Sequence, residues 1–367
     1  MRVSATQVET FELCHFQYFC RYGLNVKERR VAELNALEYG SLMHFLLERL
    51  FSGLGSKKIL ELSPEELNRR INGYLDEYVR QMFGGLETKT PRFAYLVSRT
   101  ANAAQVIVVH IAQELEQSGF YPVDFELGIG GTVGELSIPL PDGGSVRIDG
   151  KIDRVDIMDR GGKRYLRIVD YKTGKKEFKL SDIVYGMNMQ MLIYLAALCE
   201  NGKARYGDFQ PAGVLYMPAH EPSIAAPRGE KDEDLQKETE KQLRMDGLVI
   251  DDPDVIAAMD KGGSGKYIPV VLKDGVPKSR EHVASASELK AVMGYLKVLI
   301  SDMAEELQNG NIQAVPLNGG NRYDACAWCP YYAVCGHECD DPAREMDNFK
   351  RDDAMKIFSE GKGGEKE

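Results

Sequence analysis

The spacing of hydrophobic residues predicts that the first third of the chain is largely helical. Apolar residues recur at helical spacing from Leu34 to Phe51, and residues 56–120 keep a helical pattern throughout. Ser4 and Gln7 have the spacing of a capping box, in which two side chains bind free backbone amides at the start of a helix. We therefore expect a helix to begin just after Ser4.

The pattern changes near residue 123, where apolar and polar residues begin to alternate and β-branched residues become frequent. Turn signals at PDGG (141–144) and RGG (160–162) divide the stretch 123–172 into strands. The same criteria predict helices at 182–199 (with Ser181 as N-cap), 232–245 and 286–308, and strands at 212–218 and 267–272. The charged tail after about residue 345 is expected to fray.

The composition allows a sizeable core and argues against some functions. The chain has 367 residues, 43% of them apolar, and a net charge of -10, so as a whole it is not a basic nucleic-acid binder. Basic runs at 27–30 and 172–179 still allow nucleic acid to bind in one groove. There is no apolar run of membrane-spanning length and no hydrophobic signal core at the N-terminus, so we expect a soluble, cytoplasmic protein.

The segment GKIDRVDIMDRGGKRYLRIVDYKTG (150–174) places acids where a buried strand would carry apolar residues. If Gly161 and Gly162 form a two-residue hairpin turn, residues whose numbers sum to 323 face each other. The resulting pairs are Ile157 with Leu166, Val155 with Ile168, and Asp153 with Asp170. The two-residue period of a strand puts all six side chains on one face, so the two aspartates extend an apolar stripe.

Facing carboxylates in a half-buried site repel each other and lose hydration, and a cation between them removes both problems. Carboxylate oxygens suit Mg²⁺ or Mn²⁺. Lys172 lies on the same face, where its ammonium group could orient a water or neutralise charge that develops on a phosphate. The competing interpretation is that these are ordinary charges at the exposed ends of a hairpin.

Two further helical segments carry candidate residues. Gln190 and Tyr194 lie four residues apart and share one helix face, although nearby methionines also fit a core position for Tyr194. His44 lies among apolar residues in YGSLMHFLLERL. A single histidine on such a helix is more often a core residue with its hydrogen bonds satisfied than a ligand.

The cysteines indicate a metal site near the C-terminus. CAWCPYYAVC places Cys326, Cys329 and Cys335 close together, and in a reducing compartment this spacing favours metal ligation over disulfides. The fourth ligand is open: Cys339, with His337 nearby, would complete a local zinc knuckle, whereas Cys14 would staple the two ends of the chain together. Cys20 and Cys199 are expected to be buried thiols.

Taken together, these motifs resemble the RecB-type branch of the PD-(D/E)xK nucleases. The resemblance is carried by YGSLMH, GKIDRVD, VDYKTG and QMLIY. VSATQVETFELCHFQYFCRYGL at the start and CAWCPYYAVCG near the end narrow it to the nuclease domain found in AddAB helicase–nucleases of bacteria, on their AddB chain. GVLYMP and KYIPVVLKDG also lie where that family has similar stretches. Family members usually have proline after the first cluster cysteine, where this chain has His15.

The resemblance implies a role for each motif position. The catalytic Mg²⁺ or Mn²⁺ would be bound by His44, Asp153, Asp170 and the main-chain carbonyl of Tyr171. Lys172 would be the catalytic lysine, and Gln190 and Tyr194 would help to place the DNA strand and that lysine. The family's [4Fe–4S] ligands fall on Cys14, Cys326, Cys329 and Cys335.

The resemblance also implies an α/β fold of the PD-(D/E)xK, restriction-endonuclease-like type, with a mixed central sheet flanked by helices. We expect a helical region at 1–122 with the first cluster cysteine and His44, a nuclease core at 123–320, an iron–sulfur staple at 321–345 and a charged tail at 346–367. Full-length family members carry a helicase-like region upstream, so the chain would be an excised domain or a stand-alone relative.

The function implied is metal-dependent hydrolysis of DNA phosphodiesters, in the nuclease part of a bacterial complex that processes double-strand breaks for recombinational repair. The expected partners are DNA, single-stranded at the active site, and an AddA-type helicase–nuclease subunit, with no membrane. Two alternatives remain: a CRISPR-adaptation-type iron–sulfur exonuclease, and a non-catalytic DNA-binding scaffold. A ferredoxin-like electron carrier fits poorly, because one cluster ligand would lie far away along the chain and the acidic pair would stay unexplained.

Overall fold

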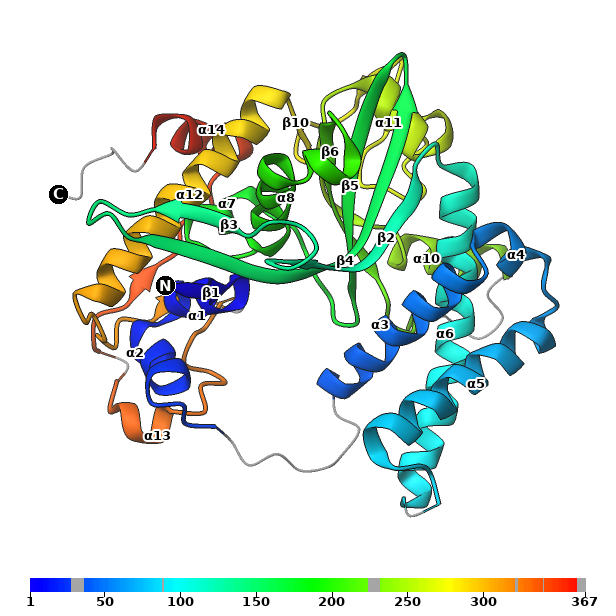
Figure 1. The fold of residues 1–367 in the computed structure, drawn as a ribbon, viewed down its shortest axis with the longest axis horizontal. Coiled ribbons are helices and arrows are strands. Elements are labelled where there is room, and N and C mark those ends of the chain that lie inside the picture. Colours follow the sequence, from blue (N-terminus) through cyan, green and yellow to red (C-terminus); the bar gives the residue numbers. More distant parts are fainter. Residues whose placement is uncertain (28–35, 88, 224–231, 321–322, 339, 362–367) are drawn as a thin grey trace.

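A mixed eight-stranded sheet forms the centre of the structure (Figure 1), a computed structural model. It describes the chain except for residues 28–35, 88, 224–231, 321–322, 339 and 362–367. The strand order is β1-β4-β5-β6-β7-β10, and β2 and β3 both pair with β4. These strands are β1 Arg2–Ser4, β2 Tyr121–Ile129, β3 Leu136–Pro139, β4 Ser145–Arg160, β5 Lys163–Lys172, β6 Gln210–Pro218, β7 Asp246–Ile250 and β10 Val283–Ala284.

The sheet combines both strand directions, as expected for a mixed sheet. Strand β4 pairs antiparallel with β2, β3 and β5, whereas β1–β4, β5–β6 and β7–β10 are parallel. Because β1 consists of residues 2–4, the N-terminal segment belongs to the same sheet as the strands that follow residue 120. The predicted fold class, α/β with a mixed central sheet and many helices, is confirmed.

The β4–β5 hairpin has the register that the sequence predicts. Val155 pairs with Ile168 and Ile157 with Leu166, and all four are buried. The turn residues Gly161 and Gly162 have φ values of 58° and 74°, the left-handed conformation that glycine adopts without strain. The regular ladder ends at the pair Arg154–Val169, so Asp153 and Asp170 follow directly at the open end of the hairpin.

The N-terminal helices agree with the predicted pattern. The capping box at Ser4 and Gln7 begins α1, and the helices that follow cover most of the stretch up to residue 117. Their bounds are α1 Ala5–Leu13, α2 His15–Tyr18, a π-helical turn Phe19–Gly23, α3 Ala36–Gly53, α4 Ser56–Glu61, α5 Pro64–Phe83 and α6 Pro91–Gln117. In Figure 1, α3, α5 and α6 lie together on one side of the sheet, away from α1 and α2.

The helix predicted at 182–199 is wrong in its bounds, because the chain breaks it into α7 (Leu180–Val184) and α8 (Gln190–Asn201). Gly186 and Asn188 both adopt positive φ, 75° and 60°, which an α-helix cannot accommodate. Ser181 lies inside α7 and is buried rather than capping it. As a result, Gln190 is the first residue of α8, at the end of the helix that faces the hairpin.

The remaining elements follow the predictions in part. The predicted helix at 286–308 is α12 (Ala286–Gln308), and β6 contains the predicted strand at 212–218. The strand predicted at 267–272 is wrong, since only Leu272–Lys273 (β8) is extended and pairs with β9 (Val276–Pro277), while β7 was not predicted. The other helices here are α9 Lys203–Tyr206, α10 Asp232–Gln242, α11 Pro253–Met259 and a 3₁₀ turn Lys261–Gly263.

The C-terminal segment is more ordered than the sequence predicts. Residues Leu317–Asn318 (β11) and Arg344–Glu345 (β12) pair in a small sheet around the cysteine segment, which contains α13 (Tyr332–Cys335). The tail does not fray up to residue 360, because α14 (Arg351–Glu360) buries Ala354, Met355 and Phe358 against the core. Buried Arg351 adds a salt bridge to Glu288 of α12 at 2.8 Å.

Two segments from opposite ends of the chain lie side by side. In Figure 1 the segment α1–α2 lies next to α13, and Tyr331 Oη donates a hydrogen bond to the Val26 carbonyl at 2.7 Å. Arg344 also donates to the backbone carbonyl of Glu12. In the described part of the chain, no helix is both long and apolar enough to cross a membrane.

Candidate active site

The two aspartates of the hairpin lie buried at the edge of the sheet. Asp153 of β4 is 7% exposed and Asp170 of β5 is 3% exposed. Asp153 Oδ2 accepts a hydrogen bond from the Tyr171 amide at 2.7 Å, which ties the ends of the two strands together. Burial together with the negative charge of Asp153 raises the pKa of Asp170 to about 6. The pair therefore has the electrostatic tension that the sequence predicts.

Lys172 provides the cation nearest to Asp170. Its Nζ lies 2.6 Å from Asp170 Oδ2, but the angles are outside hydrogen-bonding range, so this oxygen has no directed donor. Burial lowers the pKa of Lys172, but the attraction of Asp170 outweighs burial and raises it. Lys172 is therefore a charged ammonium group, with its Nζ 5.8 Å from the centre of the Tyr216 ring.

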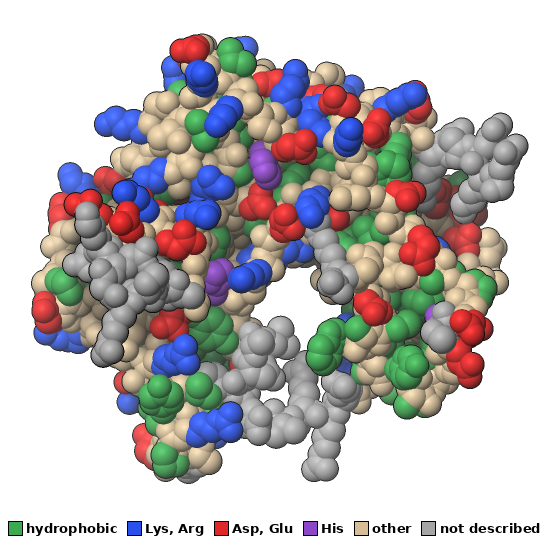
Figure 2. Space-filling view, turned by 180° about the vertical axis from the view of Figure 1, so that it is seen from behind, with side chains coloured by type: hydrophobic (Ala, Val, Ile, Leu, Met, Phe, Trp, Pro, Cys, Tyr) green, Lys and Arg blue, Asp and Glu red, His purple; other side chains and the backbone are tan. Residues whose placement is uncertain are grey.

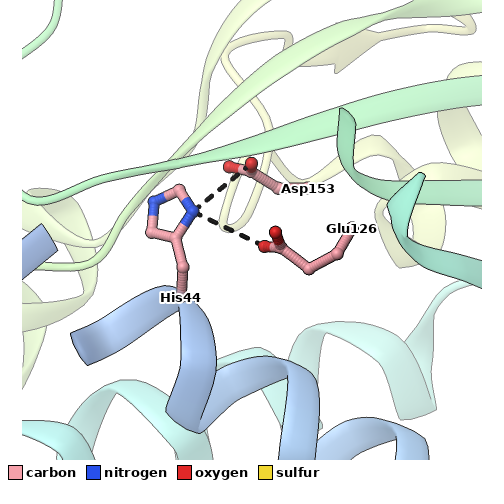
Figure 3. Close-up of side chains that lie close together, drawn as sticks. All are labelled: His44, Glu126 and Asp153. Carbon is pink, nitrogen blue, oxygen red and sulfur yellow. Dashed lines mark ion pairs between the residues drawn. The ribbon is translucent and has the colours of Figure 1, made fainter. Parts of the chain in front are cut away.

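A second group of ligand-type side chains surrounds Asp153 (Figure 3). His44 of α3, Glu126 of β2 and Asp153 of β4 each present an atom that lies within 4.8 Å of the other two. His44 Nδ1 is 3.3 Å from Asp153 Oδ1 and 3.7 Å from Glu126 Oε1. Nitrogen and carboxylate donors this close together, drawn from three separate elements, could share one divalent cation.

The charge of His44 shows how strongly this site favours a cation. Burial disfavours the imidazolium, but its hydrogen bonds to Asp153 and Glu126 raise the pKa of His44 to about 10. Lys151 forms a further ion pair with Glu126. The carboxylates thus draw positive charge to them, and a divalent ion that displaced the proton of His44 would supply that charge instead.

The carbonyl of Tyr171 belongs to the same site. It accepts a hydrogen bond from His44 Nε2 at 2.9 Å. The structure therefore brings together three of the four predicted metal donors, His44, Asp153 and the Tyr171 carbonyl. The carboxylate of Asp170 points toward Lys172 instead, and Glu126 completes the three-residue group.

A buried charge network fixes the opposite face of the hairpin. Arg154 and Arg167 both bind Glu114 of α6 and Asp156, and none of the four side chains is exposed. Arg154 also lies near the Tyr171 hydroxyl, at 3.4 Å. Because Arg154 follows Asp153 and Tyr171 follows Asp170, this network holds the backbone from which both acids project.

Helix α8 places Gln190 and Tyr194 beside the hairpin. The Tyr194 hydroxyl accepts hydrogen bonds from Gln190 Nε2, at 3.4 Å, and from the backbone at Lys151. The Tyr194 ring lies so close to Gly150 that a methyl group at position 150 would overlap it. Gly150 is therefore needed for the close approach of Tyr194 to β4.

Two cavities meet at the end of β5. A cavity of about 440 Å³ is lined by His44, Glu126, Lys151 and Thr173, among others. A larger groove of about 1670 Å³ begins at Lys172 and Thr173 and continues toward α10 and α14. Eight of its lining residues are Lys or Arg and five are Asp or Glu, so the groove is locally basic in a chain with a net charge of -10. Figure 2, seen from behind, shows an opening whose edge carries basic, histidine and apolar side chains.

The cysteine segment lies at the other end of α1. Cys14 follows α1 directly, and burial together with the neighbouring Cys335 and Cys329 raises its pKa. Cys326 is likewise affected by burial and by Cys14, so the thiols of both chain ends are neighbours. Within the described ranges, no three thiols come within 4.8 Å of one another. The alternative ligand Cys339 lies outside the described residues.

The two remaining cysteines differ from each other. Cys20 is buried as predicted, and burial and the thiols of Cys329, Cys335 and Cys14 raise its pKa. The prediction that Cys199 is buried is wrong, because this residue is exposed in the last turn of α8. The amphipathic pattern of α8 places it on the outer side of the helix.

Glu126 is a candidate residue that the sequence analysis missed. It faces Asp153 between the pairs Phe125–Arg154 and Leu127–Ile152. The apolar residues on either side, in VDFELGI, are the signal that could have identified it, since an acid inside such a strand points to the opposite face. Its φ of 52° is unusual for a residue with a side chain and marks an irregular point of the strand.

The fold and this arrangement of acids, lysine and histidine match a known nuclease class. A family model described as the PD-(D/E)XK nuclease superfamily matches residues 2–336. The chain therefore belongs to the PD-(D/E)XK nuclease superfamily, which confirms the family predicted from its motifs.

The chain is also similar to curated proteins whose names describe the AddB-type component of an ATP-dependent helicase/deoxyribonuclease. The protein from Thermoanaerobacter sp. (strain X514) is 34% identical over 342 residues, which cover 91% of this chain and 30% of the relative. The protein from Clostridium tetani is 33% identical over 346 residues, with 91% and 30% covered. For Caldanaerobacter subterraneus the values are 30% identity over 366 residues, 98% and 31%. The chain thus spans about 30% of the length of these relatives.

Proposed function

We propose that the chain is a metal-dependent deoxyribonuclease that hydrolyses DNA phosphodiesters, as the nuclease part of a bacterial helicase–nuclease that processes double-strand breaks for recombinational repair. The observation that carries the proposal is the convergence of His44, Glu126 and Asp153 within 4.8 Å, next to the Asp170–Lys172 pair at 2.6 Å. The names of the similar proteins support DNA as the substrate.

The proposed metal is Mg²⁺ or Mn²⁺, held by His44, Asp153, Asp170 and the Tyr171 carbonyl, with Glu126 as an additional carboxylate nearby. The donor set fits a hard divalent ion, because oxygen predominates and Asp170 Oδ2 is buried without a directed donor. When bound, such an ion polarises a phosphoryl oxygen and makes a water molecule more acidic.

The protein's own residues orient and neutralise the reacting groups. Lys172, held by Asp170, places a permanent positive charge where negative charge develops on the phosphate. The hydrogen bond between Gln190 and Tyr194 fixes both side chains on the face of α8 next to β4, where they position the DNA strand. Hydrolysis then releases the 3′ oxygen as leaving group, as the resemblance implies.

The basic groove that begins at Lys172 is the proposed path for the DNA strand, single-stranded where it reaches the acids. Phosphates bind well to a groove with an excess of Lys and Arg, even in an acidic protein. The phenolic rings of Tyr216 and Tyr323 are among its lining residues. Exposed bases could stack on such aromatic rings without sequence preference.

The four cysteines Cys14, Cys326, Cys329 and Cys335 are the proposed ligands of a [4Fe–4S] cluster. Thiolates are the usual ligands of such clusters, and the two cysteine-bearing ends are already joined by Tyr331 and Arg344. In this role the cluster is a structural staple. Anaerobically purified protein should be brown with visible absorbance, whereas colourless protein with one zinc ion would favour the Cys339 knuckle.

The proposed partner is an AddA-type helicase–nuclease subunit. This proposal rests on the names of the similar proteins, which describe one component of a helicase/deoxyribonuclease, and on the chain covering about 30% of their length. The helicase activity would then lie in regions of those proteins that the chain does not span.

The proposal is tested by a nuclease assay on the purified chain with labelled single-stranded DNA and Mg²⁺. We expect cleavage that EDTA stops and that Asp170→Ala lowers by at least about a thousandfold, since the variant removes a metal ligand and the partner of Lys172. Asp208→Ala, at an exposed loop acid, is the matched control. Cleavage by Asp170→Ala at the rate of the unmodified chain would refute the assignment, and binding without cleavage by the unmodified chain would favour the scaffold alternative.

A further inference from the structure

The start of α8 is held by a residue of the cysteine-bearing helix α1. Glu9 lies on α1 five positions before Cys14, and its Oε1 accepts a hydrogen bond from the Met189 amide at 2.9 Å. The backbone of Gln190 is a second donor to this carboxylate. Met189, the N-cap residue of α8, makes no side-chain cap of its own. Glu9 therefore acts as the capping group of α8 from a distant part of the chain.

The helix that Glu9 caps carries two candidate site residues. Gln190 is the first residue of α8, and it donates to the hydroxyl of Tyr194 one turn later. Tyr194 in turn lies against Gly150 of β4 and binds the backbone at Lys151. A shift of the first turn of α8 would therefore move both residues relative to Asp153.

Glu9 also faces the basic side of the site. Lys176 and Lys172 are the two cations that act on its carboxylate, although burial raises the pKa of Glu9 more strongly than they lower it. The Nζ atoms of both lysines lie 5.8 Å from the centre of the Tyr216 ring. Glu9 thus stands between the end of α8 and the lysine that follows Asp170 on β5.

The other cysteine-bearing segment reaches the same turn. Tyr323, three residues before Cys326, donates a hydrogen bond to Asp182 Oδ2 at 2.9 Å. Asn188 Nδ2 donates to the same oxygen at 2.7 Å and to the Tyr323 hydroxyl at 3.2 Å. Asn188 is buried with φ of 60°, a conformation that its neighbours must hold in place. Residues 188–190 are therefore contacted from both ends of the chain.

We propose that Glu9 is a positioning residue of the nuclease centre, which aligns Gln190 and Tyr194 by holding the first turn of α8. The proposal rests on the proposed function, because alignment matters only if the site cleaves DNA. It does not require Glu9 to touch the substrate. It assigns to α1 a second task, since the same helix carries Cys14 at one end and the support of the active site near its middle.

The experiment compares Glu9→Ala with Glu9→Gln in the full chain, using single-stranded DNA and Mg²⁺. We expect Glu9→Ala to lower kcat by about 10–100-fold with KM changed less than about twofold, because positioning affects the reacting complex more than binding. Glu9→Gln keeps an oxygen acceptor for the Met189 amide, so it should retain kcat within about threefold. Ser63→Ala, which removes the N-cap of α5, is the control for the loss of a helix cap elsewhere.

A double variant separates positioning from a general loss of stability. If Glu9 acts through Gln190, Glu9→Ala combined with Gln190→Ala should be no slower than the slower single variant, within about threefold. Rate losses that multiply in full would overturn the proposal. An unchanged kcat in Glu9→Ala, alongside normal cleavage by the unmodified chain, would also overturn it while leaving the proposed function intact.

Amide hydrogen exchange provides a readout that does not depend on activity. Glu9→Ala should speed exchange in the first turn of α8 by at least about tenfold and leave α12 unchanged, because only α8 loses its capping group. Unchanged exchange at Met189 and Gln190 would contradict the assignment. Failure of the unmodified chain to cleave DNA would refute the proposed function, and with it this role of Glu9.

Discussion

Gly150 shows how one residue without a side chain fixes the place of another. It precedes the strand segment that carries Asp153, and the Tyr194 ring occupies the space where a side chain at position 150 would lie. The backbone of Gly150 does not need a positive φ, so the need for glycine is steric rather than conformational. Any larger residue there must move either Tyr194 or β4.

We predict that Gly150→Ala lowers kcat on single-stranded DNA by about 10–100-fold, because even a small displacement of a positioning group is costly. The matched control is Gly128→Ala on the adjacent strand β2, where no atom lies within 4 Å of an added methyl group. Equal activity of the two variants would show that the position of Tyr194 is unimportant for the reaction. Near-native circular dichroism of both would exclude unfolding as the cause.

Among single residues, the sequence predicted the acids better than their partners. Asp153 and Asp170 were identified because the glycine turn and the two-residue period of strands determine the hairpin register. The contact of His44 with Asp153 depends on how α3 packs, and no local pattern encodes that. Glu126 and Glu9 were missed for the same reason, since each meets its partner across a large separation in sequence.

At the level of elements, α6 and the β4–β5 hairpin are joined by a buried group of four charges. Glu114 of α6 contacts Arg154 at 3.1 Å and Arg167 at 2.6 Å, and Asp156 completes the group. Such a group is stable only when each charge keeps its partners, because removing one leaves an uncompensated buried charge. The network lies directly behind the backbone that carries the two aspartates.

We predict that Glu114→Gln destabilises the chain by about 3–5 kcal/mol, since the two arginines then lack a buried counter-charge. Urea denaturation followed by circular dichroism measures the change. Glu116→Gln, at an exposed position of the same helix, should change stability by less than about 1 kcal/mol. A loss below about 1 kcal/mol in Glu114→Gln would mean that water or a structural shift satisfies both arginines.

Element boundaries show where local patterns stop being informative. Helix α12 was predicted with its observed ends because Ser285 and Glu288 form a capping box and the apolar spacing is regular. The break between α7 and α8 was not predicted, because the positive φ of Asn188 is held by Asp182 and Tyr323, which are tertiary partners. The order of α14 likewise depends on its packing against α12.

At the level of the whole molecule, the basic groove explains how an acidic chain could bind DNA. Its Lys and Arg side chains come from β5, from the loop after it, and from α10 and the segment before α14. These segments are far apart in sequence, so composition alone could not reveal the groove. Only the run at 172–179 was visible as a basic cluster beforehand.

We predict that replacing Lys241 and Arg244 together by alanine weakens binding of single-stranded DNA and lowers the slope of log affinity against log salt by about 1.4, or about 0.7 for each lost phosphate contact. Fluorescence anisotropy at several salt concentrations measures both quantities. Alanine at Lys57 and Lys58, on α4 and outside the lining of the groove, is the control with the same change of charge. An unchanged slope would mean that the DNA follows another path.

The central claim is that the edge of the β4–β5 hairpin holds a divalent ion used to cleave DNA. Crystals soaked in Mn²⁺ test it most directly, through an anomalous difference map recorded at the manganese edge. We predict a peak in coordination contact with Asp153, Asp170 and a nitrogen of His44, at about the 2.0–2.3 Å expected for a hard divalent ion and its oxygen and nitrogen ligands. A map that shows His44 still bound to the Tyr171 carbonyl, with no peak beside the two aspartates, would contradict the account.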